Sequence, residues 1–341
     1  MQALVQLGGG KRALEERPKP ELAASTDAIV KITRTTLCSS DLHIKKDESP
    51  GRIPGHEGVG VIDSVGAAVT AFKPGDRVVI SSISACGSCV YCRKLMYSQC
   101  TTGGLILGER VDGTQAGFVR VPYADTSLYI IPDTADEDAA VLLSETLPTG
   151  FECGVLNGNI QPGGTVAIIG CGPIGLAALL TAQFYEPAEI IVIDLDDSRL
   201  EVARGLGASA TLNSLHCKAP ESVLKMTGGR GVDTVIEAVG FPAAFELCEK
   251  IVAPGGTIAN IGVHSTHVDL HLENLWRRNI TISTRLVDTV STPTLLNMLL
   301  SDKIELQPFI THRFKFDRIL DAYETVAHSA DNGALKVIIE S

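Results

Sequence analysis

Short runs of alternating apolar and polar residues, cut by glycine and proline, dominate the chain from Met1 to about Arg120. Four of them are expected to form strands: Ala28–Ile32, Gly58–Val65, Arg77–Ile80 and Gly117–Val121. A Lys-Pro-Gly-Asp turn signal at residues 73–76 leads into one of these strands. Together these features predict a compact, barrel-like β domain whose loops carry its chemistry.

From about Asp133 the pattern changes to strands that alternate with helices. A helix-like acidic segment, Ala135–Gly154, leads into a strand of β-branched residues and then into an Ala/Leu-rich helix. Six strand candidates lie between Thr165 and Arg285, and a helix is expected at Pro242–Val252. The clearest strands are Thr165–Ile169, Glu189–Ile193, Gly231–Ala238, Thr257–Ile261 and Thr281–Arg285. The alternation predicts an α/β domain with a doubly wound parallel sheet.

The end of the chain does not fit into that sheet. A helix is expected at Pro293–Leu300, and the last residues, ALKVIIES, have the composition of a strand. A doubly wound sheet of six strands has no place left for this strand. We therefore expect it to return to the first domain, which makes that domain discontinuous.

Composition limits the classes of partner. The 341 residues are enough for about two domains. The 29 basic and 40 acidic residues give a net charge of -11, which argues against nucleic acid and anionic lipid as partners. A small anionic cofactor can still bind locally, because backbone N–H groups supply the donors.

The N-terminal residues lack the long apolar core of a signal peptide, and runs such as Ile190–Ile193 are too short to cross a bilayer. We therefore expect a cytoplasmic protein with no membrane partner. Disulfides are not expected in that compartment, so the nine cysteines, four of them clustered, point to metal binding.

The stretch from Leu37 to Gly60 holds a first candidate metal site. Cys38, His56 and Glu57 are ligand types that zinc prefers. His56 and Glu57 are adjacent on a turn, and Cys38 lies 18 residues upstream, close enough for one loop to return it. The alternative is a buried cysteine beside two solvated polar groups.

A second candidate metal site is a run of four cysteines, Cys86, Cys89, Cys92 and Cys100, spaced C-x2-C-x2-C-x7-C. Four thiolates can surround a tetrahedral zinc, and the two-residue gaps let successive turns point their sulfurs at one centre. An iron–sulfur cluster also takes four cysteines and is the alternative. We interpret the run as a closed, structural zinc site, because no coordination position is left for a substrate.

A glycine-rich motif stands between the first strand and the first helix of the α/β domain. The motif is Gly170-Cys171-Gly172-Pro173-Ile174-Gly175. In this context Gly170 allows the sharp turn, Gly172 lets a pyrophosphate approach the backbone, and Gly175 lets helix and strand pack closely. The phosphates are then expected at the helix N-terminus.

An acidic residue follows this motif at the distance that a dinucleotide fold requires. Asp194 ends the second strand, 19 residues after Gly175, where it can accept a hydrogen bond from the 2′-hydroxyl of a ribose. Its charge would repel a 2′-phosphate, so NAD is favoured over NADP. Arg199 can contact the adenosine ribose or bind a phosphate, which leaves NADP as the alternative.

Taken in order, these motifs resemble the zinc-dependent alcohol dehydrogenases of the medium-chain dehydrogenase/reductase superfamily. The resemblance covers essentially all 341 residues. It implies a GroES-like β-rich catalytic domain formed by residues 1–148 and 289–341, which carries both zinc sites. It also implies a Rossmann NAD-binding domain formed by residues 149–288, and a homotetrameric assembly.

The resemblance assigns metal-binding roles to four residues. Cys38 and His56 resemble ligands of the catalytic zinc, and Glu57 resembles a glutamate that binds or approaches this metal. Many relatives have an aspartate ligand just before a Leu-Pro-Thr-Gly motif, and Glu145 occupies that position here. Because glutamate is one methylene longer, either Glu57 or Glu145 completes the zinc shell.

The resemblance also implies three catalytic residues close to Cys38. Asp41 is expected to fix the ring of His56, as metal-bound histidines usually require. Ser40 takes the place of a hydroxyl that hydrogen-bonds the substrate alcohol, and His43 that of a histidine that passes the proton outward. The loop before His56 is shorter than in many relatives, which is expected to change the entrance for the substrate.

Further cofactor contacts are implied in the second half of the chain. They are Ala238, Val239, Ile261, Gly262, Val263 and Arg285. Lys336 is a further candidate, with a solvated surface charge as the alternative.

The implied activity is the reversible oxidation of a small primary or secondary alcohol to an aldehyde or ketone, with hydride transfer to NAD. A polyol or amino-alcohol dehydrogenase with the same zinc and NAD machinery is the alternative among enzymes. A non-catalytic NAD-binding or structural relative is the alternative from another class.

Overall fold

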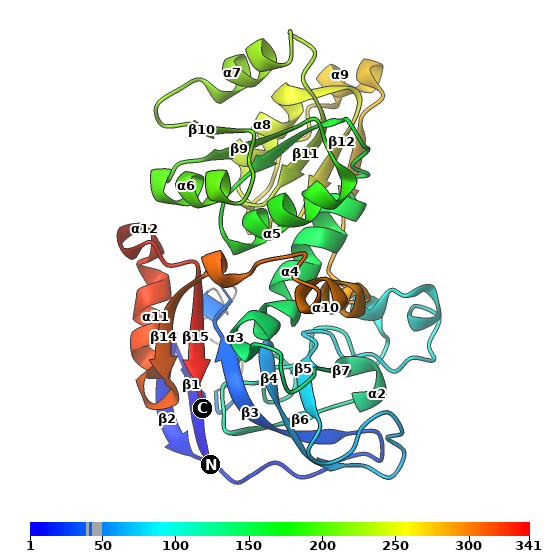
Figure 1. The fold of residues 1–341 in the computed structure, drawn as a ribbon, viewed down its shortest axis with the longest axis vertical. Helices are drawn as coiled ribbons and strands as arrows, with labels where there is room; N and C mark the ends of the chain where they lie inside the picture. The colour runs from blue at the N-terminus through cyan, green and yellow to red at the C-terminus, as the bar shows by residue number, and fades with distance from the viewer. Residues whose placement is uncertain (39–40, 43–49) are drawn as a thin grey trace. The chain divides into compact units, whose positions relative to one another are not determined.

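The computed structural model describes residues 1–38, 41–42 and 50–341. The chain divides into two compact units, one formed by Met1–Glu145 and Asp288–Ser341 and the other by Thr146–Val287 (Figure 1). Among the described residues no helix has the length and apolar character to cross a bilayer.

The first unit is built on a seven-stranded sheet that is mostly antiparallel. Its main path runs β14-β15-β3-β4-β5-β7, and β6 pairs with β3 outside this path. The strands are β3 (Ala28–Thr36), β4 (Gly58–Val65), β5 (Arg77–Ile80), β6 (Phe118–Val121), β7 (Leu128–Ile130), β14 (Ile310–Lys315) and β15 (Lys336–Glu340). A separate hairpin joins β1 (Gln2–Gly8) to β2 (Lys11–Glu16). The predicted β-rich first domain is therefore present, and alternating apolar side chains such as Val30, Ile62 and Val78 form its core.

Helices in the first unit are short. They are α2 (Ala124–Ser127), α3 (Glu137–Ala140), α10 (Thr292–Leu300), α11 (Ile319–Ala327) and α12 (Ser329–Asn332). Single 3-10 turns lie at η1 (Cys92–Lys94), η2 (Tyr97–Gln99), η3 (Val141–Leu143), η7 (Gln307–Phe309) and η8 (Phe316–Arg318). Helix α11 packs its buried side chains, among them Ile319 and Tyr323, against β15 residues Val337 and Ile339.

The C-terminal strand β15 lies in the first unit, as the sequence predicted. It pairs in parallel with β14 and antiparallel with β3, where Ile338 stands opposite Thr36. This strand therefore lies beside the end of β3 (Figure 1).

The second unit is a six-stranded sheet in which all pairs are parallel, in the order β10-β9-β8-β11-β12-β13. The strands are β8 (Thr165–Ile169), β9 (Glu189–Asp194), β10 (Ala210–Asn213), β11 (Val232–Glu237), β12 (Val252–Asn260) and β13 (Thr281–Thr284). Numbered within the unit, this order is 3-2-1-4-5-6, the doubly wound arrangement of a Rossmann fold. The predicted fold is confirmed.

Helices connect these strands and cover the sheet. They are α4 (Thr146–Thr149), α5 (Pro173–Ala182), α6 (Asp197–Gly205), α7 (Ala219–Met226), α8 (Pro242–Ile251) and α9 (Leu272–Leu275). A π-helical stretch, η4 (Gly150–Leu156), and the 3-10 turns η5 (Gln183–Tyr185) and η6 (Trp276–Arg278) complete the unit. The strand least visible in the sequence is β10, whose four residues are all half-buried, because an edge strand lacks the continuous apolar run of a central one.

Candidate active site and metal centres

Four potential metal ligands converge in the first unit. Single donor atoms of Cys38, His56, Glu57 and Glu145 all lie within 4.8 Å of one another. Strand pairing explains the first three, because Thr35 near the end of β3 stands opposite Gly58 at the start of β4. The loop that leaves β3 is thereby held beside the turn that enters β4.

Glu145 is positioned in this cluster by the hydrogen bonds of the preceding residue, Ser144. The Ser144 side chain exchanges hydrogen bonds with the backbone N–H and carbonyl of Gly58, at 3.1 and 3.2 Å. Ser144 is fully buried, so these bonds fix the end of η3 against the start of β4. Glu145 follows directly and points its carboxylate at His56.

The donor set fits a tetrahedral zinc. The Nε2 atom of His56 lies 3.0 Å from Oε2 of Glu145. Two ligands of a zinc with bonds of about 2.0 Å stand roughly 3.3 Å apart, so a small adjustment admits the ion between them. One sulfur, one imidazole nitrogen and carboxylate oxygens are a mixture that zinc accepts.

Burial and neighbouring charges shift the pKa values of three of these side chains in different directions. Burial alone would raise the pKa of Glu145, but the charge and hydrogen bond of His56 lower it to about 2. Burial alone would lower the pKa of His56, yet Glu145 and Cys38 raise it well above its ordinary value. Burial, followed by the charge of Glu145, raises the pKa of the Cys38 thiol. A bound cation would compensate the carboxylate charge and favour the thiolate.

Glu57 has a different partner. Its Oε2 atom lies 2.7 Å from the Lys336 ammonium, and the two side chains are only 1% and 3% exposed. Lys336 also donates to the carbonyl of Leu37 at 3.4 Å. Burial would lower the pKa of Lys336, but the charge of Glu57 raises it, so the pair is ionic. Lys336 is therefore not a solvated surface charge.

Asp41 lies near the histidine but not in hydrogen-bond contact with it. Its Oδ1 atom is 4.0 Å from Nδ1 of His56, which is longer than a hydrogen bond. Its Oδ2 atom accepts from the backbone N–H of Cys38 at 3.0 Å. The predicted proton-transfer residues Ser40 and His43 lie outside the described residues.

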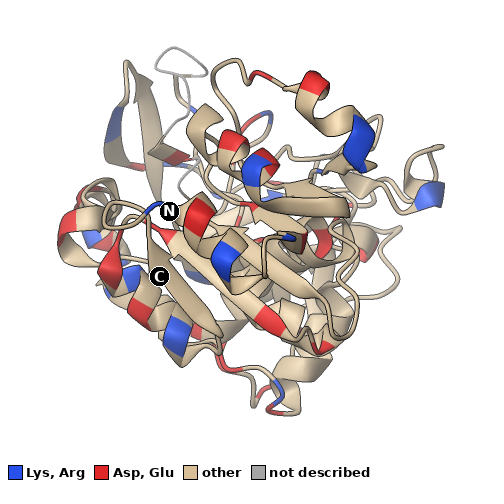
Figure 2. Cartoon of the chain, turned by 90° about the horizontal axis from the view of Figure 1, so that it is seen from above, with Lys and Arg blue, Asp and Glu red and all other residues tan. Residues whose placement is uncertain are grey.

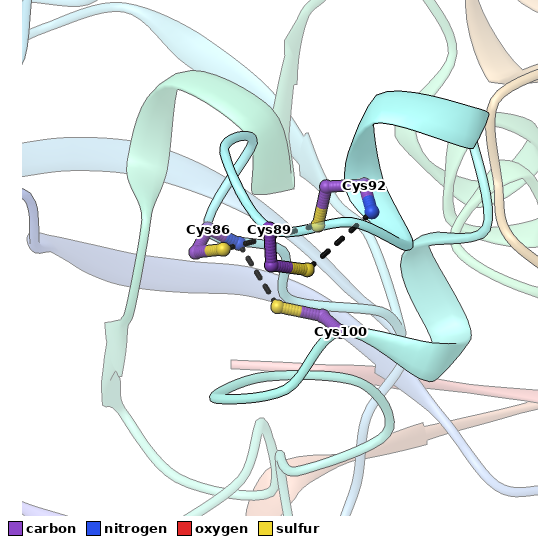
Figure 3. A group of neighbouring side chains, drawn as sticks. All are labelled: Cys86, Cys89, Cys92 and Cys100. Atoms are coloured by element: carbon purple, nitrogen blue, oxygen red, sulfur yellow. Dashed lines mark hydrogen bonds between the residues drawn. The ribbon is translucent and has the colours of Figure 1, made fainter.

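Cys86, Cys89, Cys92 and Cys100 form a second cluster in the first unit (Figure 3). We call the segment that carries them, residues 86–100, the lobe. Their sulfurs lie within 4.8 Å of one another, and those of Cys86 and Cys92 are 3.9 Å apart. Sulfurs around a tetrahedral zinc with bonds of about 2.3 Å stand roughly 3.8 Å apart, so the cluster has the size of a zinc site. Two backbone N–H groups of the lobe, from Cys86 and Cys92, donate to the sulfurs of Cys100 and Cys89.

Backbone hydrogen bonds and burial shift the pKa values of two of these four cysteines in opposite directions. Backbone N–H groups, first that of Cys92 and then that of Thr101, lower the pKa of Cys89 to about 5. Burial, with the neighbouring thiols of Cys89 and Cys100, raises the pKa of Cys92 to about 12. Four thiolates cannot share this space without a compensating cation, which is the charge that a metal supplies.

In the second unit the glycine motif has the predicted context, because it follows β8 and opens α5. Gly170 has a φ of +93°, and a Cβ atom there would meet the Ala238 carbonyl at 2.9 Å. A Cβ at Gly175 would stand 1.9 Å from the Gly170 carbonyl oxygen, so helix and turn touch. Nothing lies within 4 Å of a Cβ built at Gly172, where a phosphate needs free space.

Asp194 ends β9 and turns its carboxylate toward this motif. Its Oδ2 atom accepts from the Cys171 N–H at 2.5 Å, and Oδ1 accepts from the N–H groups of Leu195 and Asp196. The Nε atom of Arg199 lies 3.7 Å from Asp196. Asp194 therefore orders the glycine turn, a contact that spacing alone did not predict.

The remaining predicted cofactor residues lie on two loops that follow β11 and β12, except Arg285, which is exposed just after β13. One residue that the sequence did not single out, Glu237, joins these loops. Its Oε1 atom accepts from the N–H groups of Val239 and Gly240 at 2.9 Å, and its Oε2 atom lies 3.3 Å from His264. Glu237 is fully buried, and its carboxyl group connects both loops at one edge of the sheet.

Comparison with known proteins points to one family. Residues 24–133 match the profile of the alcohol dehydrogenase GroES-like domain, and residues 173–301 match that of the zinc-binding dehydrogenases. An alcohol dehydrogenase of Cupriavidus necator is 36% identical over 366 residues, which cover 100% of this chain and 98% of that protein. A sorbitol dehydrogenase of Bacillus subtilis is 29% identical and covers 99% of this chain and 97% of its own length.

A solved structure agrees with this grouping. Zinc dependent alcohol dehydrogenase 2 from Streptococcus pneumonia, in its apo form, superposes with a TM-score of 0.95. It is 48% identical and covers 100% of this chain and 98% of its own.

Proposed function

The chain belongs to the zinc-dependent alcohol dehydrogenases of the medium-chain dehydrogenase/reductase superfamily, and we propose that it oxidises a small primary or secondary alcohol reversibly, with NAD as hydride acceptor. The observation that carries this proposal is the convergence of Cys38, His56 and two carboxylates within 4.8 Å. In the reverse reaction the substrate is the corresponding aldehyde or ketone, which is reduced to the alcohol.

Cys38, His56 and one carboxylate would hold the catalytic zinc in this proposal. Zinc bound there acts as a Lewis acid that favours the alkoxide form of an alcohol. The Cys38 thiolate and the carboxylate reduce the charge of the site, and Ser40 and His43 pass the alcohol proton outward. Asp41 orients His56 from behind.

Glu145, rather than Glu57, supplies the carboxylate ligand. The Lys336 ammonium already neutralises Glu57 at 2.7 Å, whereas Glu145 directs its charge at the ligand atom of His56. A cation in the centre gains more from a carboxylate that a buried ammonium has not already neutralised. Lys336 thereby leaves Glu57 as a structural anion beside the metal.

Two isosteric variants separate these carboxylates. Glu145→Gln is expected to lower zinc affinity and kcat by about 10–100-fold, the usual cost of disturbing a metal site. Glu57→Gln is expected to retain zinc but lose about 3–5 kcal/mol of stability, because it leaves the Lys336 charge buried and unpaired. Zinc content by mass spectrometry and the unfolding midpoint measure the two effects. Zinc loss in Glu57→Gln alone would assign the ligand to Glu57.

The second unit holds the NAD in this proposal. The free space at Gly172 and the N-terminus of α5 receive the pyrophosphate, and Asp194 accepts from the adenosine ribose. Arg199 contributes to the same end of the cofactor, and the loops joined by Glu237 contribute Ala238, Val239, Ile261, Gly262 and Val263. Arg285 is assigned to the cofactor from the resemblance alone. NAD supplies the hydride acceptor, and these residues position it.

A polyol dehydrogenase is the second candidate, since the sorbitol dehydrogenase of Bacillus subtilis matches nearly the whole chain. We also propose a homotetramer in the cytoplasm, from the resemblance to bacterial relatives. Basic and acidic residues are interspersed in Figure 2. A nucleic-acid partner would favour a continuous basic patch.

One experiment tests the activity. Purified protein is assayed with primary alcohols, secondary alcohols and polyols, with NAD and with NADP, and its zinc content is measured on the same sample. We expect about two zinc ions per chain and reduction of NAD by simple alcohols, with NADP used less well. A protein with one zinc per chain and no turnover would contradict the proposal, and turnover restricted to polyols would favour the second candidate.

A further inference from the structure

A chain of buried polar side chains runs from the predicted zinc site to the C-terminal helix α11. The Asp41 Oδ2 atom accepts from Nε2 of Gln115 at 3.2 Å, and Oε1 of Gln115 accepts from the Tyr323 hydroxyl at 2.7 Å. Asp41, Gln115 and Tyr323 are 2%, 0% and 5% exposed, so these hydrogen bonds are shielded from water. The residues come from three distant segments of the first unit.

The hydrogen bonds of this chain have a fixed direction. An ionised carboxylate only accepts, so the Gln115 amide must turn its N–H toward Asp41. The amide oxygen then faces Tyr323, whose hydroxyl must donate. Each bond therefore points its donor toward Asp41, and bonds aligned in this way in a dry interior strengthen one another.

The backbone places Gln115 with little freedom. The N–H of Gln115 donates to the Pro54 carbonyl, and that of Thr114 donates to Gly55, the residue before His56. A Cβ atom at Gly55 would lie 2.7 Å from Cγ of Gln115, and Gly55 has a φ of +94°. Only glycine at this position lets the Gln115 side chain pass behind the histidine.

Tyr323 is equally fixed. It projects from α11 (Ile319–Ala327), and the guanidinium of Arg12 lies 4.2 Å from its ring centroid. Arg12 also donates to the backbone carbonyl of Asp41 at 2.6 Å. Arg12 and Tyr323 therefore approach Asp41 together, one through the backbone and one through Gln115.

We propose that Gln115 and Tyr323 are positioning residues for the zinc ligand His56, which they orient through Asp41. Two donors, the Cys38 N–H and the Gln115 amide, occupy Oδ2 of Asp41. The other oxygen lies 4.0 Å from Nδ1 of His56, the nearest side-chain approach of Asp41 to this ring and longer than a hydrogen bond. A proton held on Nδ1 leaves the lone pair of Nε2 facing the zinc, as outer partners of metal-bound histidines do.

This inference rests on the proposed function, because it takes His56 as a zinc ligand. It differs from a purely structural role in what it predicts. A hydroxyl that only satisfies a buried amide affects the stability of the whole unit. A positioning residue changes how firmly the catalytic zinc is held, while the zinc of the four-cysteine lobe is unaffected.

The test measures zinc release from the full chain into a chromophoric chelator, which separates the two zinc ions by rate. Loss of one phase in Cys38→Ser identifies the catalytic zinc. We expect Tyr323→Phe to accelerate that phase by about two- to fivefold, the size of one hydrogen bond acting at a distance. Gln115→Leu removes the direct partner of Asp41 and is expected to accelerate the same phase by about tenfold or more.

Tyr129→Phe is the matched control. Tyr129 is a partly buried tyrosine of the same unit, and its hydroxyl donates to the Thr289 carbonyl at 2.9 Å. Its catalytic phase is expected to match the wild type. A second readout is the tautomer of His56, followed by the nitrogen chemical shifts of its ring in zinc-loaded protein. In Gln115→Leu we expect the resonance of protonated Nδ1 to broaden or shift.

Three outcomes overturn the inference. They are an unchanged catalytic phase in both variants, an equal acceleration of both zinc phases, and an equal effect of Tyr129→Phe. Each of these outcomes is compatible with a wild-type protein that binds two zinc ions and oxidises alcohols, so the proposed function would survive. A wild type that releases only one zinc would contradict both.

Discussion

Replacing Cys38 with serine is expected to abolish alcohol oxidation while the fold persists. The hydroxyl of serine is far less acidic than a thiol, so it does not supply the anionic sulfur that zinc binds. Loss of the metal removes a Lewis acid worth several kcal/mol, which lowers kcat by on the order of a thousandfold or more at about 1.4 kcal/mol per factor of ten. Steady-state kinetics with the best alcohol of the panel measures the effect.

The same sample distinguishes loss of metal from loss of structure. We expect zinc content to fall by one ion per chain while circular dichroism is unchanged, because the lobe retains its own zinc. Cys217→Ser is the matched control, since Cys217 is a partly exposed cysteine of the second unit outside both clusters. Activity that persists in Cys38→Ser would mean that the catalytic centre lies elsewhere.

Replacing Cys89 with serine is expected to destabilise the first unit. Its sulfur belongs to the four-thiol cluster, and a structural zinc contributes directly to folding free energy. Loss of a few kcal/mol lowers the unfolding temperature of a unit of this size by roughly 5–15 °C. Differential scanning calorimetry, with zinc content measured alongside, checks this result.

A control from the same lobe separates zinc loss from local disturbance. Val90 is 59% exposed in the same loop, so Val90→Ala is expected to retain both zinc ions and the wild-type unfolding temperature. If Cys89→Ser unfolds at the wild-type temperature although its lobe zinc is lost, the metal is not structural. Bound iron in the wild type would instead indicate a cluster.

Much of the fold could be predicted because its signals are short-range. The glycine motif was convincing because a β-branched strand precedes it and an apolar helix follows it, all within about 20 residues. The four cysteines were recognisable for the same reason, since consecutive turns alone bring such sulfurs together. The edge strand β10 is not among the strands located from the sequence, because its half-buried residues leave no clear period.

The immediate surroundings of the predicted zinc site were less accessible to sequence reasoning. The spacing of Cys38, His56 and Glu57 suggested a metal, and the structure brings Glu145 to the same point through Ser144 and Gly58. Sequence spacing carries no information on which carboxylate already has a cationic partner. The surroundings of Asp194 were equally inaccessible. Its place in the sequence suggested a ribose contact, but not the hydrogen bonds that its carboxylate accepts from three backbone N–H groups.

The sequence by itself therefore determined the two zinc motifs, the dinucleotide motif and the class of chemistry, because each depends on residues that are close along the chain. Only the tertiary structure shows which carboxylate of the predicted zinc site, Glu57 or Glu145, is paired with a buried ammonium. Lys336 reaches Glu57 across 279 residues, and Tyr323 reaches Gln115 across 208, both through strand and helix packing that returns the C-terminus to the first unit. Contacts of this kind arise from the pairing of β15 with β3, and no local pattern in the sequence encodes which side chains then meet.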